Sequence, residues 1–503
     1  MTASAIPIAV VLTSLLPGLV IFFLPEEQRR TRTGLNLLGA VSKVGLIALL
    51  IPLVVGGADL EWRHELMPGI DLLLRAEPLS LYFVALSAVL WLATTVYAVG
   101  YLEDEPHRSR FFGFLGICVT AATGIALAGN LVTFLLFFEL LTLSTYPLVT
   151  HRGTRDAMAG GRTYLAYTLS GGMALLLGVA WLTSLVGPVE FTPGGVAQVA
   201  ELAAEQPGTA RAIFAVLIAG VGVKAALVPL HSWLPKAMIA PAPVSALLHA
   251  VAVVKAGVYG VIRVVHHVFG VQLADGLGVL APLAAIAAVT IVYGSLRALS
   301  EDDLKRRLAW STVSQLSYIT LGAALVGVGA TAGGVVHLAH QGLMKITLFF
   351  CAGVIAEVLH LKKVSELPGV GRRMPLTGAA FTLAAFGMIG LPPMAGFVSK
   401  WQLGTGAIEA GSAWVVVVLG VSAALNAAYF LPPVYAMWFQ HPDEGAEWHQ
   451  EERRRRRHLE GPASLVLPTV FTAVLALAAG LLAGLPYSPL ELARIIAEGS
   501  YPT

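Results

Sequence analysis

Long apolar runs separated by short polar segments repeat along the whole chain of 503 residues. A run of about 20 apolar residues is long enough to cross the hydrocarbon core of a bilayer as a helix. The runs lie at 5–24, 34–56, 78–101, 111–129, 131–150, 163–186, 210–230, 243–267, 276–298, 305–327, 332–358, 375–400, 412–439 and 464–485. The pattern therefore predicts an all-α polytopic membrane protein with about fourteen transmembrane helices.

The positive charges between the runs indicate an even number of helices. When the loops are numbered in order, the odd loops hold 22 of the 32 Lys and Arg residues and the even loops hold four. Loops rich in Lys and Arg stay in the cytoplasm during insertion. We therefore expect the odd loops to face the cytoplasm and both termini to lie outside a bacterial or archaeal-type inner (plasma) membrane.

Composition excludes an ordinary soluble protein, because 12% of the residues are charged and 56% are hydrophobic, against roughly 25% charged in soluble domains. Cys118 and Cys351 lie inside apolar runs without metal-ligand spacing, which predicts packing roles. The chain has no CxxC pair, haem motif or nucleotide fingerprint. We expect no cofactor, no metal, no nucleic-acid partner and no enzymatic chemistry; any redox centre would belong to another chain.

Several ionisable residues lie deep inside the apolar runs. A charged side chain at the bilayer centre costs at least about 2.5–3.5 kcal/mol, so a set of them needs a reason. Lys43 is expected near the start of a span instead. The deep residues are Glu139, Lys224, Lys255, Lys345 and Lys400. They predict proton movement, with a fixed Glu–Lys pair that stabilises a helix contact as the alternative.

Two runs carry prolines beside a deep lysine: Pro229 and Pro235 after Lys224, and Pro392 and Pro393 before Lys400. Proline inside a helix removes a backbone hydrogen bond and breaks the helix, and one broken helix in each half is typical of inverted-repeat transporters. The predicted organisation is 1–110 (spans 1–3), 111–267 (first five-helix repeat, spans 4–8), 276–440 (second repeat, spans 9–13) and 441–503 (a cytoplasmic basic loop, span 14 and the C-terminal tail).

One run between the two broken helices places polar residues in a row. His337, Gln341 and Lys345 are spaced by four residues and share a helix face, with His340 beside the row. Imidazole can carry a proton near neutral pH, so this helix is predicted to connect the two halves. Zinc binding by the histidines is disfavoured because no Cys or carboxylate lies nearby.

His249 precedes Lys255 by six residues, so the two lie on nearly opposite helix faces. They are predicted to serve successive steps of a pathway. The alternative for His249 is a core histidine whose ring bonds a hydroxyl.

These residues lie in motifs through which the chain resembles the antiporter-like subunit family. The family comprises the A-type and D-type subunits of Mrp-type cation/proton antiporters and the proton-pumping membrane subunits of complex I and membrane-bound hydrogenases. The resemblance covers about residues 75–440. It rests on FFELLTLSTYPLV, KAALVPLHSWLPKA, APAPVSALLHAVAVVKAGVY, EDDLKRRLAWSTVSQLSYI, HQGLMKITLFF and LPPMAGFVSKW, which occur in the family's order.

The resemblance implies a role for each deep residue. Glu139 resembles the acid of the fifth span and Lys224 its partner on the seventh. Lys255 resembles the connecting residue of the eighth span, and Lys400 the lysine of the twelfth. His337 and Lys345 resemble the central relay. A lysine on the twelfth span and the chain length favour the D-type subunit of the Mrp antiporters.

Two positions depart from the family pattern. Gln341 stands where the family often has His, and since Gln carries no charge, His340 is expected to take its place. Glu77 replaces an Asp before the third span, a change expected to concern only a loop.

Together these features predict a proton-translocating subunit of a multisubunit monovalent cation (Na+)/proton antiporter. Its partners would be the bilayer and other membrane subunits. An environment with one deep carboxylate and several lysines disfavours Na+, because the ammonium groups repel it and too few oxygen ligands are present. Na+ is therefore expected to pass through a partner or an interface. A subunit of a complex I-like or hydrogenase complex, and a non-conducting structural subunit, remain alternatives. The loop at 441–461, with five consecutive arginines, is expected to be solvated or to contact lipid headgroups.

Overall fold

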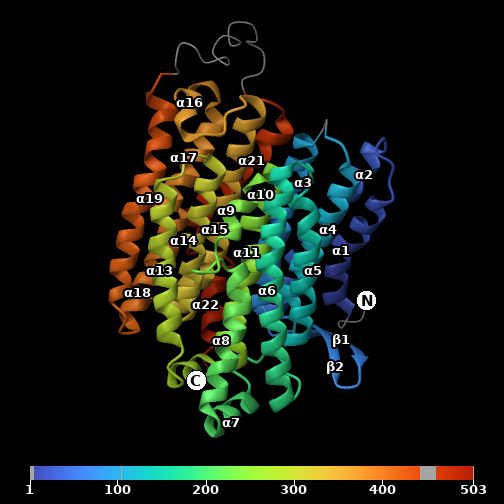
Figure 1. The fold of residues 1–503 in the computed structure, drawn as a ribbon, viewed down its shortest axis with the longest axis vertical. Helices are drawn as coiled ribbons and strands as arrows, with labels where there is room; N and C mark the ends of the chain where they lie inside the picture. Colours follow the sequence, from blue (N-terminus) through green and yellow to red (C-terminus); the bar gives the residue numbers. More distant parts are fainter. Residues whose placement is uncertain (1–4, 103–104, 442–459, 502–503) are drawn as a thin grey trace.

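The computed structural model describes residues 5–102, 105–441 and 460–501 as one bundle of long helices that stand side by side (Figure 1). The first half contains α1 (Ile6–Phe22), α2 (Arg29–Val55), α3 (Pro78–Tyr101), α4 (Arg108–Leu127), α5 (Leu131–Val149), α6 (Arg155–Val186), α7 (Ala197–Glu205), α8 (Pro207–Lys224), α9 (Trp233–Lys236), α10 (Ala242–Ala250) and α11 (Val253–Ile262). The second half contains α12 (Val271–Gly276), α13 (Leu280–Leu299), α14 (Leu304–Ala323), α15 (Val328–Val358), α16 (Val370–Arg373), α17 (Pro375–Ile389), α18 (Ala395–Glu409), α19 (Trp414–Phe439), α21 (Ala463–Leu481) and α22 (Pro489–Gly499).

Within the described residues, eleven helical segments are long and apolar enough to cross a membrane, and α1 and α17 are shorter apolar helices. The prediction of an all-α polytopic membrane protein is confirmed, and the count of fourteen spans stays a prediction. Most of the basic loop, including Arg453–Arg457, lies outside the described residues.

The chain leaves helical structure at both proline-containing positions. α8 ends at Lys224, and the irregular segment that follows contains Pro229; Pro235 lies within the short α9. α17 ends before Gly390, whose φ of 93° is left-handed, and Pro392 and Pro393 lie between it and α18.

A further interruption divides the span predicted to run unbroken over 243–267. α10 ends at Ala250, α11 begins at Val253, and a π-helical segment, η3 (Arg263–Phe269), continues α11. No proline lies between α10 and α11, so the sequence does not predict this interruption. This segment is entirely buried and lies at the centre of the bundle.

A β-hairpin and α7 project from one end of the bundle, opposite the end where α16 lies (Figure 1). β1 (Leu60–Met67) pairs antiparallel with β2 (Ile70–Ala76). Arg63 forms ion pairs with Asp71 at 2.7 Å and with Glu190 at 2.8 Å. The ion pair with Glu190 therefore links the hairpin to the segment that follows α6.

Candidate functional site

Lys224 and Glu139 lie near each other without touching. The Lys224 side chain is fully buried, donates a hydrogen bond to the carbonyl oxygen of Phe138 and lies 3.4 Å from the centroid of the Phe138 ring. Among the described residues, no ion pair joins the two groups, and the buried Glu139 Oε1 has no hydrogen-bond partner. A buried carboxylate oxygen without a partner is costly. The arrangement thus favours a proton or a water molecule at Glu139.

Glu139 lies at the edge of the chain on α5. Its side chain is half-buried, and Leu136 and Leu143, one turn to either side, are exposed. On the other side, Glu139 lies against Gly172 of α6: a Cβ atom there would lie 2.0 Å from Glu139 Oε1, so a larger residue would require the carboxylate to move. The carboxylate therefore packs against α6, close to the side of the bundle where Leu136 and Leu143 are exposed.

The break after α8 is held by contacts to its backbone. The Trp233 indole donates a 2.7 Å hydrogen bond to the carbonyl of Val223, which also accepts a 3.1 Å hydrogen bond from the backbone N–H of Ala226. Ala226 has a φ of 56°, a left-handed conformation that costs roughly 1–3 kcal/mol in a non-glycine residue. Gly257 of α11 packs directly on this backbone, because a Cβ there would lie 2.1 Å from Ala225 N. The position of Lys224 is thus fixed by α11.

Lys255 connects the first half of the chain to α15. Its buried amine donates one hydrogen bond to the carbonyl of Leu338, at 2.7 Å, and another to the side-chain oxygen of Gln341. The expectation that His340 takes the place of a histidine at 341 finds no support in these contacts. Neither ring nitrogen of His340 has a hydrogen-bond partner among the described residues.

His337 joins α15 to two other helices of the second half. Its Nδ1 lies 2.8 Å from Ser399 Oγ, and its Nε2 lies 3.1 Å from Gln315 Oε1 on α14. Ser399 is the residue before Lys400, so the ring reaches the neighbourhood of that lysine. His337 is therefore placed between the central helix and the second broken helix.

Lys345 contacts α14 rather than α18. Its amine donates hydrogen bonds to Ser311 Oγ at 2.7 Å and to the carbonyl of Leu308 at 3.0 Å. The Tyr429 hydroxyl of α19 lies 2.9 Å from the same Ser311 Oγ, and it also donates to the side-chain oxygen of Asn426. A buried polar chain thus leads away from Lys345.

The same chain reaches Lys400. Asn426 donates through Nδ2 to the carbonyl of Met388 at 3.2 Å. Lys400 donates to that carbonyl and to the carbonyl of Ile389, each at 2.8 Å. Both carbonyls lie at the end of α17, where the break removes their helical partners. Lys345 and Lys400 are therefore connected through Ser311, Tyr429 and Asn426, three residues that lie outside the predicted set of site residues.

His249 lies apart from this chain. Its Nε2 is 3.2 Å from the sulfur of Met238, and its ring stacks on Phe349 with centroids 4.5 Å apart. Its contact is thus with a thioether and an aromatic ring rather than with the hydroxyl expected for a core histidine.

The structure corrects the expected position of Lys43. It lies in the middle of α2 rather than near the start of a span, because the arginines before the apolar run already form the first turn of this helix. Its buried amine donates hydrogen bonds to Ser14 Oγ at 2.9 Å and to Thr123 Oγ1 at 2.7 Å. The described residues thus hold five deep lysines rather than four.

The structure also corrects the expectations for Arg263 and Glu77. Arg263, one of the four basic residues counted with the even loops, is fully buried in η3 and forms an ion pair with Glu77, the residue before α3. It also donates to the hydroxyls of Tyr259, at 2.7 Å, and Ser80, at 3.1 Å. The expectation that Glu77 concerns only a loop is therefore wrong.

Comparison with known proteins relates this arrangement to a family. Residues 128–426 match the family described as "NADH:quinone oxidoreductase/Mrp antiporter, TM". The NADH-quinone oxidoreductase subunit N of Desulforudis audaxviator is 35% identical over 460 residues, which cover 88% of each chain. The chain belongs to this family of membrane subunits. The predicted resemblance is thereby confirmed.

Solved structures agree on the fold of this NADH:quinone oxidoreductase/Mrp antiporter family member. A chain of the Mrp complex from Dietzia sp. DQ12-45-1b superposes with a TM-score of 0.84 at 23% identity, covering 100% of this chain and 98% of that one. A chain of the archaeal membrane-bound sulfane sulfur reductase also gives 0.84, at 21% identity, with 98% and 97% coverage. The protein is a multi-pass membrane protein with this fold.

Proposed function

We propose that this chain is a proton-translocating subunit of a multisubunit monovalent cation (Na+)/proton antiporter in the inner membrane, with both termini outside. The observation that carries the proposal is the buried polar chain from Lys345 to Lys400. The hydrogen-bond acceptors of these amines are carbonyl and hydroxyl oxygens rather than carboxylates, so each amine can lose its proton without leaving an unpaired anion behind. Such sites suit proton exchange better than fixed structural pairing.

The pathway proposed runs from Glu139 to Lys224, through Lys255 to the polar row of α15, and on to Lys400. The hydroxyls of Ser311 and Tyr429 can each accept one proton while releasing another. The Asn426 amide and the Met388 carbonyl cannot, so the last transfer to Lys400 requires water or a movement of Lys400. Gln341 holds the Lys255 amine but carries no charge, so transfer past it requires water or a movement of Lys255. His337 offers a second branch toward Lys400 through Ser399.

Sodium is proposed to pass elsewhere, in a partner subunit or at an interface. A hard cation needs several oxygen ligands close together, and Glu139 is the one carboxylate beside Lys224 among the described residues. The partners proposed are other membrane subunits, since structural neighbours come from multisubunit membrane complexes. Well-ordered Na+ density beside Glu139 in an experimental map of the assembly would contradict this assignment.

The central test is the Glu139→Gln variant in the native complex, with proton movement followed in membrane vesicles by a pH-sensitive dye. We expect at least a tenfold loss of cation-driven proton exchange while all subunits still copurify. Glu409→Gln, at an exposed acid on α18, is the matched control and should keep full transport. Full activity of Glu139→Gln would overturn the proposal.

A second candidate is a proton-pumping subunit of a respiratory complex. It is favoured by the 35% identity to a relative named NADH-quinone oxidoreductase subunit N, over 88% of each chain. Purification of the native complex through a tag on this chain, followed by mass spectrometry of its partners, separates the two. Partners with iron–sulfur or flavin sites favour the respiratory complex, and their absence with cation-driven exchange favours the antiporter. A non-conducting structural subunit would lack transport defects in every variant of the pathway.

A further inference from the structure

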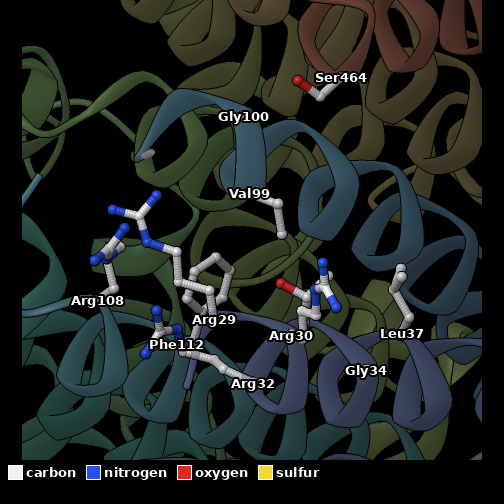
Figure 2. Close-up of a pocket in the computed structure, with 11 residues that line it drawn as sticks. Arg29, Arg30, Arg32, Gly34, Leu37, Val99, Gly100, Arg108, Phe112 and Ser464 are labelled. Carbon is white, nitrogen blue, oxygen red and sulfur yellow. The ribbon is translucent and has the colours of Figure 1, made fainter. Parts of the chain in front are cut away.

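A basic pocket lies outside the proposed pathway, among the first turns of α2, α4 and α21 and the end of α3. It has a volume of about 600 Å³. Figure 2 shows the guanidinium groups around it and Ser464 of α21 across from them. The charged residues that line it are Arg29, Arg30, Arg32 and Arg108.

One carboxylate organises part of this cluster. Glu26 accepts hydrogen bonds from the backbone N–H groups of Arg108 and Ser109, both at 3.0 Å, and lies 3.9 Å from the Arg32 guanidinium. Burial alone would raise the pKa of Glu26, but these N–H bonds and the charge of Arg32 outweigh it and hold the pKa below its usual value. Glu26 is therefore ionised and fixes Arg32 and Arg108 in place.

The other two arginines, Arg29 and Arg30, line the pocket and are available to bind a ligand. Arg29 and Arg30 are exposed, and neither forms an ion pair with a carboxylate in the part of the chain that the structure describes. The guanidinium groups of Arg29 and Arg30 therefore add positive charge that no carboxylate of the described residues pairs with. Planar guanidinium groups suit the paired oxygens of a phosphate.

The backbone adds to the same potential. α2 begins at Arg29, α4 at Arg108 and α21 at Ala463, so three helix N-termini meet at the pocket. The N-terminus of a helix carries a partial positive charge that favours anions. Glu26 already accepts from the N–H groups of Arg108 and Ser109 at the start of α4, so α2 and α21 are the N-termini more open to a ligand.

The surroundings favour a lipid over a free anion. Leu37, Val99 and Phe112 supply apolar walls. Along α2, the row that starts at Gly34 continues with Leu38, Val41 and Leu49, which are 63%, 57% and 69% exposed. Acyl chains can lie along this row while the headgroup sits among the arginines.

We propose that the pocket binds the phosphate headgroup of an anionic phospholipid whose acyl chains lie along the exposed face of α2. Basic pockets between transmembrane helices attract anionic headgroups through charge and hydrogen bonding. Such a lipid would bridge α2, α4 and α21, which are far apart in sequence. It would therefore fasten the N-terminal helices to the C-terminal span.

The test compares the purified, delipidated complex carrying either the unaltered chain or the Arg29→Gln/Arg30→Gln chain. Phosphatidylglycerol, phosphatidylcholine and inorganic phosphate are added in turn, and the Tm and the lipids retained in native mass spectrometry are measured. A ligand that binds only the folded state raises Tm. We expect phosphatidylglycerol alone to raise Tm by several degrees, and the double variant to lose at least half of this rise and retain less phosphatidylglycerol.

Arg155→Gln/Arg162→Gln, at two exposed arginines of α6 outside the pocket, is the matched control and should respond like the unaltered chain. An equal loss in this control would mean general surface charge and overturn the proposal. So would an unchanged response of the double variant. An equal Tm rise with inorganic phosphate would assign the pocket to a free anion instead.

A cross-linking experiment covers the case in which the double variant fails to assemble. A photoreactive amino acid is placed at Leu37 in the pocket or at Leu176 on the exposed face of α6. In membranes with equal phosphatidylglycerol and phosphatidylcholine, Leu37 should label phosphatidylglycerol several-fold more selectively than Leu176. Equal selectivity at the two positions would overturn the proposal.

Discussion

Lys255 on α11 donates a hydrogen bond to the side-chain oxygen of Gln341 on α15, and this contact joins the two halves of the chain. Loss of the Gln341 side chain would leave the Lys255 amine with the Leu338 carbonyl as its remaining acceptor, and an unmade hydrogen bond of a buried donor costs about 1–3 kcal/mol or more when charged. We expect Gln341→Leu to lower proton exchange at least tenfold and to reduce Tm. Gln341→His restores an acceptor that can also carry a proton, and should keep or raise the rate. A Gln341→Leu complex with normal rate would show that the contact is dispensable.

Tyr429→Phe removes one hydroxyl from the chain between Lys345 and Lys400 and leaves the ring in place. The connection from Ser311 to Asn426 is then interrupted. Proton exchange should fall about tenfold, while the free energy of unfolding falls by roughly 1 kcal/mol for the lost hydrogen bond. Tyr435→Phe, at an exposed tyrosine on the same helix, is the control and should change neither. Vesicle transport assays decide between these outcomes.

Gly257→Ala places a methyl group 2.1 Å from Ala225 N, where only backbone lies. Backbone must then move, so we expect a loss of at least about 2 kcal/mol in stability and displacement of Lys224 from Phe138. Thermal unfolding of the complex measures the first effect, and the transport rate reports the second. Gly45→Ala on α2 meets nothing within 4 Å and serves as the control. Equal Tm values for the two variants would refute the close contact.

Lys43→Met is expected to behave differently from changes in the pathway. Ser14 and Thr123 also donate to carbonyls of their own helices, Val11 at 3.2 Å and Val119 at 2.7 Å, so they keep partners without the amine. Replacing a buried charge with an apolar side chain of similar size is often neutral or stabilising. We expect unchanged transport and an unchanged or higher Tm. A marked loss of transport would bring Lys43 into the pathway.

His151, in the loop after α5, gives a prediction for pH. Burial lowers the pKa of His151 to about 4, with a further contribution from the charge of Arg110. In the unfolded chain its pKa is about 6.5, so the unfolded state binds the proton more readily. Stability should be constant above pH 6.5 and fall between pH 6.5 and 4, by up to about 1.4 kcal/mol per pH unit. His151→Gln should show a shallower fall of Tm over this window than the unaltered chain; parallel curves would contradict the assignment.

The apolar runs and prolines are sufficient to predict the helical bundle and the two broken helices, because hydropathy and missing N–H groups are local properties. The interruption between α10 and α11 is not predictable in this way. α10 ends at Ala250 and α11 begins at Val253, and neither a proline nor a glycine marks the interruption. The hairpin also escapes prediction, because its strands lie between long apolar runs and do not alternate regularly between apolar and polar residues.

The deep lysines can be predicted from the sequence, because a charge inside an apolar run is energetically costly and therefore rare. The residues that contact them cannot be predicted in this way. Ser311, Tyr429 and Asn426 are ordinary polar residues of membrane helices, and only the tertiary arrangement that brings Tyr429 of α19 to Ser311 of α14 joins them. Lys43 is misplaced by the sequence pattern because the apolar run understates the length of α2, which begins at charged residues. Side-chain pairing across helices is a tertiary property that spacing within one helix does not encode.

The place of Glu139 between exposed Leu136 and Leu143 has a consequence for the assembly. An acid at the rim of a chain experiences the dielectric and the charges of whatever is packed against that rim. Lipid there would favour its neutral form, whereas a cation on an adjacent subunit would favour its anion. If Glu139 is the first proton-binding group of the proposed pathway, it is positioned to respond to the neighbouring subunit, and assembly of the complex would then set its protonation.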